Sequence, residues 1–238
     1  MRVRAAVASL AMGLGLATAG CDALPGKPKP SDQQPLPSQV MAFGALYGTN
    51  CAGCHGTDGQ LGASRPLNDP VYLALVPRDR VRRVIADGVP GTLQPAFGAS
   101  AGGTLTEAQV DALVKGIFDR WGKSAKSDVA GMPPYASAAG DPTRGQAVYA
   151  TACAACHGPE GKGGSKGGSV ADPSYLALVS DQYLRTTVIA GRSDLGMPDW
   201  RGYTPGQPLT ERQVSDVVAW LAAQRRPVPG RILPMKGS

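Results

Sequence analysis

One unit of about 80 residues occurs twice in this 238-residue chain, over 39–121 and 141–227. Both copies contain, in the same order, a CxxCH sequence, an Asp-Pro-x-Tyr-Leu-Ala-Leu-Val run and a Leu-Thr-Glu run. The offset between the copies grows only from 102 residues at the cysteines to 104 at Leu-Thr-Glu. This tandem duplication predicts two domains with the same internal geometry.

The periodic segments of each copy are typical of helices. In the first copy a Thr-x-x-Gln capping box at Thr106 opens an apolar stripe with helical spacing, formed by Val110, Leu113, Val114, Ile117 and Trp121. The second copy repeats the box at Thr210 and the stripe at Val214, Val217, Val218 and Leu221. Asp141 and Pro142 predict the start of a helix that leads into the second CxxCH. No alternating strand pattern occurs, so the predicted fold class is all-α.

Large side chains are scarce for two domains of this size. Aromatic residues make up 5% of the chain, with three Phe and three Trp, whereas Gly (32) and Pro (21) are plentiful. Small domains bury little surface, so such cores are hard to fill with side chains alone. Either the interiors are loose, or a group other than an amino acid fills them.

The CxxCH sequences indicate what that group is. Two residues between cysteines place both sulfurs within reach of the two vinyl groups of one haem, and the following histidine can bind the iron. We therefore predict two covalent haem c groups, one on Cys51 and Cys54 with His55, and one on Cys153 and Cys156 with His157.

Three other uses of these cysteines fit less well. A zinc ribbon needs its two CxxC pairs about 15–20 residues apart, whereas the two pairs of this chain are offset by 102 residues. A thioredoxin-like pair should follow a strand, and no strand is predicted here. Disulfides would suit an exported protein, but they would leave both of its histidines, which lie in the two CxxCH sequences, without a role.

Both copies resemble class I c-type cytochrome domains, and the chain resembles a di-haem c-type cytochrome. The resemblance rests on a helix into CxxCH, a Met-Pro loop and a closing amphipathic helix. It covers about two thirds of the chain. It implies about three helices around each haem, His55 and His157 as proximal ligands, and Met197 as the distal ligand of the second haem. The first copy departs from the family pattern, because Gln94 stands before Pro95 where the family has Met.

The first haem is therefore ligated by His and Gln94, by His and Met132, by His and water, or is five-coordinate. We expect Met132 to pack in the linker between the domains and Met41 to pack in the core. Two histidines in the chain exclude bis-His ligation unless another chain donates one. A thioether favours ferrous iron and an amide oxygen favours ferric iron, so we expect the first haem to have the lower potential and to pass electrons to the second.

The amino terminus resembles a bacterial export signal. In residues 1–21 two arginines precede about 15 apolar residues, a stretch too short to span a bilayer. It ends on Thr18-Ala19-Gly20-Cys21, which resembles a lipobox with Thr18 in place of the usual Leu. We expect Cys21 to be acylated and to anchor the protein on the periplasmic side of the membrane; cleavage after Ala19, which would release a soluble periplasmic protein, is the alternative.

The segments outside the copies are predicted to be connecting segments. Residues 22–38 contain five prolines and predict an extended tether. Residues 122–140 form a Gly/Ser/Pro-rich linker, and 228–238 a tail.

The formal net charge of +6 comes mostly from these segments and the signal. No basic stripe with interleaved aromatics occurs, which argues against nucleic-acid binding. We interpret the densest basic run, 78–83, as a solvated helix face.

The leading functional hypothesis is an electron carrier. A six-coordinate second haem has no open position, which suits single-electron transfer between respiratory-chain components. The expected partners are redox proteins: a quinol-oxidising complex, a terminal oxidase or a soluble cytochrome. The main alternative is a haem enzyme that uses an open distal position on the first haem, and a haem-bearing structural subunit is the third hypothesis.

Overall fold

The computed structural model describes residues 26, 29, 32–122 and 129–226. The chain divides into two compact units, Met1–Gln39 and Val40–Ser238. In the first unit the Asp32 N–H donates to the Lys29 carbonyl (2.8 Å), and a 3₁₀ helix, η2, covers Pro37–Gln39. The described residues of the Pro-rich segment therefore include turns, where an extended tether was expected. The signal segment, Cys21 and the tail 228–238 lie outside the described residues.

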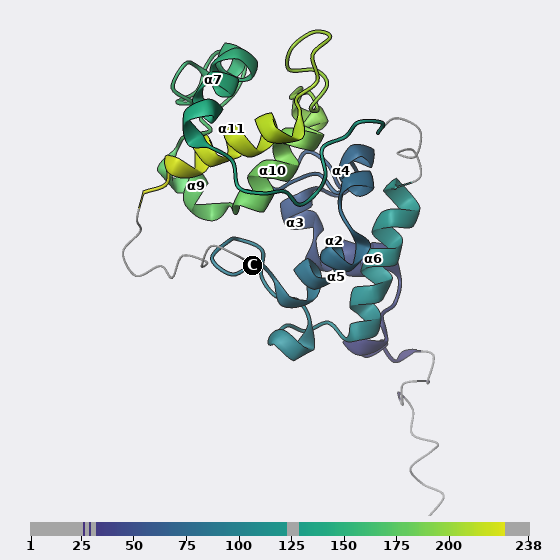
Figure 1. The fold of residues 1–238 in the computed structure, drawn as a ribbon. Helices are drawn as coiled ribbons and strands as arrows, with labels where there is room; N and C mark the ends of the chain where they lie inside the picture. Colours follow the sequence, from purple (N-terminus) through teal and green to yellow (C-terminus); the bar gives the residue numbers. More distant parts are fainter. Residues whose placement is uncertain (1–25, 27–28, 30–31, 123–128, 227–238) are drawn as a thin grey trace, which may run out of the picture. The chain divides into compact units, whose positions relative to one another are not determined.

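In the second unit the two copies repeat one order of α-helices (Figure 1), while the 3₁₀ helix of the first copy follows the Gln94 position and that of the second precedes Met197. The first copy contains α2 (Phe43–Asn50), α3 (Ala52–His55), α4 (Pro70–Leu75), α5 (Arg78–Asp87), η3 (Ala99–Ala101) and α6 (Glu107–Trp121). The second contains α7 (Pro142–Ala152), α8 (Ala154–His157), α9 (Pro173–Leu178), α10 (Asp181–Ala190), η5 (Ser193–Leu195) and α11 (Glu211–Ala223). No extended strand occurs among the described residues, which confirms the all-α fold class. None of the helices in the described ranges is long and apolar enough to span a membrane.

Side-chain caps start the closing helix of each copy. Thr106 accepts from the Gln109 N–H while the Gln109 side chain binds back to the Thr106 N–H, and Thr210 and Gln213 do the same before α11. Both predicted capping boxes are confirmed. The Asp141 side chain caps α7 by accepting from two backbone N–H groups, with Pro142 in the first turn. Each cap satisfies backbone donors that the first turn of a helix leaves without partners.

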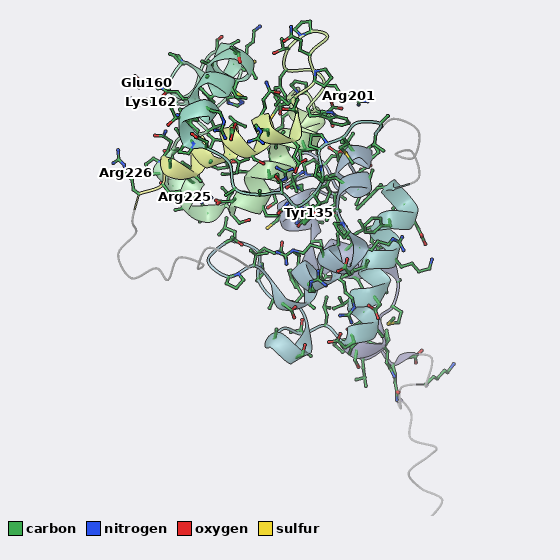
Figure 2. The ribbon with its side chains drawn as sticks, viewed as in Figure 1. Tyr135, Glu160, Lys162, Arg201, Arg225 and Arg226 are labelled. Carbon is green, nitrogen blue, oxygen red and sulfur yellow. The ribbon has the colours of Figure 1, made fainter. Side chains whose placement is uncertain are left out.

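The predicted apolar stripes form two core clusters. Val110, Leu113 and Ile117 are at most 1% exposed in the first cluster, and Val214 and Val217 are fully buried in the second. The clusters meet at Leu75, a first-copy residue buried in the second cluster, and at Tyr135, which packs against both (Figure 2). The domain boundaries at 39–121 and 141–227 stay a prediction.

The expectation that Met41 packs in the core is wrong. Its side chain is 45% exposed. Phe43, two residues later, packs there instead: it stacks on Tyr47 (centroids 5.5 Å apart) and meets Trp121 edge-on (5.7 Å). An aromatic ring buries more apolar area than a methionine and gains from these ring contacts, so it takes the core position.

A buried arginine holds the linker against the second copy. Arg185, 6% exposed on α10, donates to the Pro134 carbonyl (2.7 Å), the Tyr135 carbonyl (3.1 Å) and the Ser215 hydroxyl (3.1 Å). Burial lowers the pKa of the Arg185 guanidinium. Met132 in the same linker packs against the second core cluster.

The basic run on α5 is a solvated helix face, as interpreted. Arg82 pairs with Glu107 (2.5 Å) and Asp111 (2.7 Å), and Arg83 pairs with Asp79 (2.7 Å). The side chains of these arginines are 39% and 52% exposed. Exposed pairs of this kind contribute about 0–1 kcal/mol each, so the run needs no ligand to explain it.

Candidate haem sites

Both CxxCH sequences adopt one backbone conformation. The helix before each of them ends at the first cysteine, where φ/ψ is −121°/−35° at Cys51 and −120°/−32° at Cys153. The N–H of each cysteine still donates to the tyrosine four residues earlier, at 2.8 and 2.9 Å. One further helical turn, α3 or α8, then carries the second cysteine and the histidine. The predicted attachment residues of each copy are therefore gathered on one turn.

Each histidine is held in the tautomer that iron needs. His55 Nδ1 lies 2.7 Å from the Arg65 carbonyl oxygen, and His157 Nδ1 lies 2.8 Å from the Gly168 carbonyl oxygen. A carbonyl oxygen only accepts, so Nδ1 must carry the proton in both rings, and Nε2 is left with its lone pair. This second contact also fixes the ring orientation, as in most sites where histidine binds a metal. The residues present fit a haem iron in both copies.

A tyrosine closes the turn after each histidine, and we did not anticipate it from the sequence. The Tyr47 hydroxyl donates to the Gly56 carbonyl (2.9 Å), and the Tyr149 hydroxyl donates to the Gly158 carbonyl (2.7 Å). Gly56 has φ +82°, and a Cβ there would lie 1.7 Å from the Gln60 carbonyl oxygen, so this tight turn requires glycine. A tyrosine four residues before the first cysteine in both copies was the available signal.

The cysteine thiols do not resemble those of a redox-active or zinc-binding pair. Burial raises the pKa of Cys51 to about 11 and that of Cys153 to about 12, whereas a reactive CxxC thiol has a lowered pKa. No disulfide joins the four described cysteines. Within the described ranges no three His, Cys, Asp or Glu side chains form a group that could hold a metal ion, as a zinc ribbon would require.

The two distal loops share one backbone hydrogen bond at the predicted ligand position. In the first copy the Val89 N–H donates to the Gln94 carbonyl at 3.0 Å; in the second the Arg192 N–H donates to the Met197 carbonyl at 3.0 Å. Each loop then returns to the helix before it: Phe97 binds α5 and Trp200 binds α10, both through N–H···O bonds of 3.0 Å. Gln94 therefore occupies the place in the first copy that Met197 occupies in the second.

The structure brings Gln94 and His55 together. Burial lowers the pKa of His55. The hydrogen bond to the Arg65 carbonyl opposes that shift, and the Gln94 side chain, as an acceptor, opposes it to a smaller extent. No such contact joins Met197 to His157 among the described residues, and Met132 packs in the second core cluster, which is against its use by the first haem. Both distal assignments, Gln94 and Met197, stay predictions.

A pair of glycines tests the distal loop of the second copy. Gly191 has φ +74°, and a Cβ there would lie 2.4 Å from the Pro198 carbonyl oxygen and 2.6 Å from that of Met197. We expect Gly191→Ala to lower the free energy of unfolding of the holoprotein by about 2–4 kcal/mol, from backbone strain and overpacking together. Chemical denaturation measures this value, and the red-region charge-transfer band of Met-ligated ferric haem reports on the loop.

The matched control is Gly196→Ala. Gly196 has a similar φ of +81°, but nothing lies within 4 Å of a Cβ built there. Gly196→Ala should lower the free energy of unfolding only by the strain of the left-handed backbone, about 1–2 kcal/mol, and should leave the charge-transfer band in place. Equal effects of the two variants would contradict the close approach of Gly191 to the Met197 loop.

The chain matches a known family over most of its described length. The family described as cytochrome c oxidase, cbb3-type, subunit III matches residues 38–115 and 140–221, which together are about two thirds of the chain. The chain belongs to this family. Each matched segment covers most of one copy, and the prediction of a di-haem c-type cytochrome with two covalent haem c groups is confirmed.

Several curated relatives come from this family. A cbb3-type cytochrome c oxidase subunit CcoP of Azospirillum sp. is 32% identical over 180 residues, covering 68% of this chain and 56% of the relative. Subunit FixP of Bradyrhizobium diazoefficiens is 30% identical, and the match covers 66% of this chain and 53% of the relative. Subunit CcoP of Rubrivivax gelatinosus is 33% identical, and the match covers 57% of this chain and 40% of the relative. The chain thus spans about half the length of the curated relatives it matches.

Proposed function

We propose that this di-haem cytochrome carries single electrons between respiratory-chain components and is not itself the enzyme that turns over a substrate. The relatives described above are all subunits of cbb3-type cytochrome c oxidases, which favours a terminal oxidase as the partner. A quinol-oxidising complex or a soluble cytochrome would then be the electron donor.

The observation that carries this proposal is the backbone equivalence of Gln94 and Met197. The haems, when bound, supply the one-electron couple of their iron. The chain's own residues make the two couples different: His55 and His157 are oriented alike, while a hard amide faces one site and a soft thioether the other. A site closed by Met197 has no position for a substrate, which supports transfer rather than catalysis.

We also propose that the protein is held on the periplasmic side of the membrane through acylated Cys21. The lipobox-like sequence before Cys21 supports this anchor. Two or more acyl chains on one residue would bind stably, whereas a single chain gives only marginal binding.

A spectroscopic redox titration of the purified holoprotein tests the function. We expect two separate one-electron transitions, one equivalent of the Met-ligated charge-transfer band per two haems, and the band on the haem with the higher potential. Two equivalents of the band would overturn the role of Gln94. Rapid carbon monoxide binding to the first haem, together with turnover of peroxide or nitric oxide, would overturn electron transfer as the sole activity.

A further inference from the structure

The segment that follows the first CxxCH contacts the distal loop of the second copy. The Leu61 N–H donates to Asp194 Oδ2 at 3.0 Å, and Arg192 Nη2 donates to the Gly62 carbonyl at 3.1 Å. Gly62 itself lies against the CxxCH turn, because a Cβ there would be 2.2 Å from the Cys54 carbonyl oxygen. Two hydrogen bonds therefore join the attachment turn of one site to the loop of the other.

The second-copy side of this contact is a buried ion pair. Arg192 Nε and Nη2 each lie 2.9 Å from an Asp194 oxygen, and the two side chains are 11% and 1% exposed. The paired guanidinium lowers the pKa of Asp194. The Arg192 backbone is bonded twice to Met197, N–H to carbonyl in both directions, each at 3.0 Å. The residue that binds Gly62 thus also holds the proposed ligand.

Arg65 forms the second connection. Its carbonyl accepts from His55, while its guanidinium, in a side chain only 5% exposed, donates to Thr187 Oγ1 on α10 at 2.5 Å. The same guanidinium lies over the rings of Tyr72 (4.6 Å) and Tyr183 (5.3 Å). One residue therefore touches the proximal histidine of the first site and the helix that ends just before the distal loop of the second.

The duplication does not repeat this arrangement. At the corresponding offset Arg65 is replaced by Gly168, Arg192 by Val89 and Asp194 by Gly91. The contact can form in one direction only, from the proximal side of the first site to the distal side of the second.

We propose that Leu61, Gly62, Arg65, Arg192 and Asp194 form an inter-copy clamp that positions the Met197 loop, so that ligation of the second haem depends on residues of the first copy. The clamp residues are positioning residues, since they act through the His55 ring and the Met197 backbone. This inference rests on the proposed ligation by Met197. It adds that the two haem sites are coupled through protein contacts and are not independent of each other.

Hydrogen exchange and cyanide binding on the full-length holoprotein test the clamp. Asp194→Asn removes the charge and one acceptor, so the Leu61 amide should exchange at least ~10-fold faster, the effect of losing a bond to a charged group. Cyanide binding to the second ferric haem should accelerate by a similar factor, because the Met197 loop opens more often. Arg65→Lys, a change in the other copy, should also accelerate it.

Asp199→Asn is the matched control. Asp199 lies two residues after Met197 and pairs with Arg201 (2.6 Å), which belongs to the second copy as well. This variant should leave Leu61 exchange unchanged. If Arg65→Lys and Asp194→Asn speed exchange but leave the cyanide rate of the second haem at the wild-type value, the contact is packing only and the proposal is overturned.

The failure of the proposed ligation has a separate signature. If the wild-type protein lacks the Met-ligated band, Met197 is not the ligand of the second haem. The clamp then cannot act on that ligation, and this result is known before any variant is made. A wild-type protein that shows the band, with variants that leave its cyanide rate unchanged, overturns the clamp alone.

Discussion

Replacing Cys153 and Cys156 together with alanine is expected to reduce the covalently bound haem from two groups per chain to one. The two thioether bonds are what keep the porphyrin attached under denaturing conditions, and histidine ligation alone does not survive them. The measurement is the haem content and the mass of the polypeptide after acid extraction of non-covalent haem. The second domain should also lose much of its stability, because its small core is built around the haem.

Two controls separate this effect from a general maturation defect. Cys51→Ala with Cys54→Ala should leave one haem as well, with a spectrum that keeps the Met-ligated band. Cys21→Ser should leave both haems, because Cys21 lies outside both CxxCH sequences. Two haems retained on the Cys153/Cys156 variant would contradict covalent attachment at that site.

Exchanging the distal residues should exchange the properties of the two haems. We expect Gln94→Met to raise the Met-ligated band from one to two equivalents and to raise the potential of the first haem. Met197→Gln should abolish the band and lower the potential of the second haem. Axial ligands set haem potentials over roughly 0.8 V, so each shift should be on the order of 100 mV. Spectroelectrochemical titration of each variant gives both readouts.

The exchange is a fair test because the carbonyls of Gln94 and Met197 accept the corresponding backbone hydrogen bond in the two loops, from Val89 and Arg192. Met132→Leu is the control, because Met132 packs in the second core cluster. It should change neither band nor potential. A loss of band in Met132→Leu, with none in Met197→Gln, would assign the ligand to the linker methionine.

Local and repeated features of this protein could be predicted from the sequence. The capping boxes at Thr106 and Thr210, the buried stripes and the start of α7 at Asp141 depend on neighbouring residues, and each was expected. The CxxCH turns were expected because their spacing matches one cofactor. Repetition strengthened each prediction, since a pattern present twice at a constant offset rarely arises by chance.

Features that depend on tertiary contacts could not be predicted in this way. Met41 and Phe43 lie two residues apart, and only the packing of α2 on α6 decides that the half-buried aromatic ring, and not the methionine, lies against the core. The carbonyl partners of His55 and His157 belong to Arg65 and Gly168, unlike residues that share a backbone role. The side chains of the clamp, Arg65, Arg192 and Asp194, stand where the copies differ, so comparing the copies with each other gave no signal for it.

The one-way contact between the copies has an evolutionary consequence. Duplicated genes recombine readily within themselves, and a crossover between the halves would place Gly168 where Arg65 belongs, or Val89 where Arg192 belongs. Such a hybrid would keep both CxxCH turns but lose hydrogen bonds between its halves. Once these three positions had diverged, the halves were no longer interchangeable, and selection on the pair would act against the sequence exchange that keeps young duplicates alike.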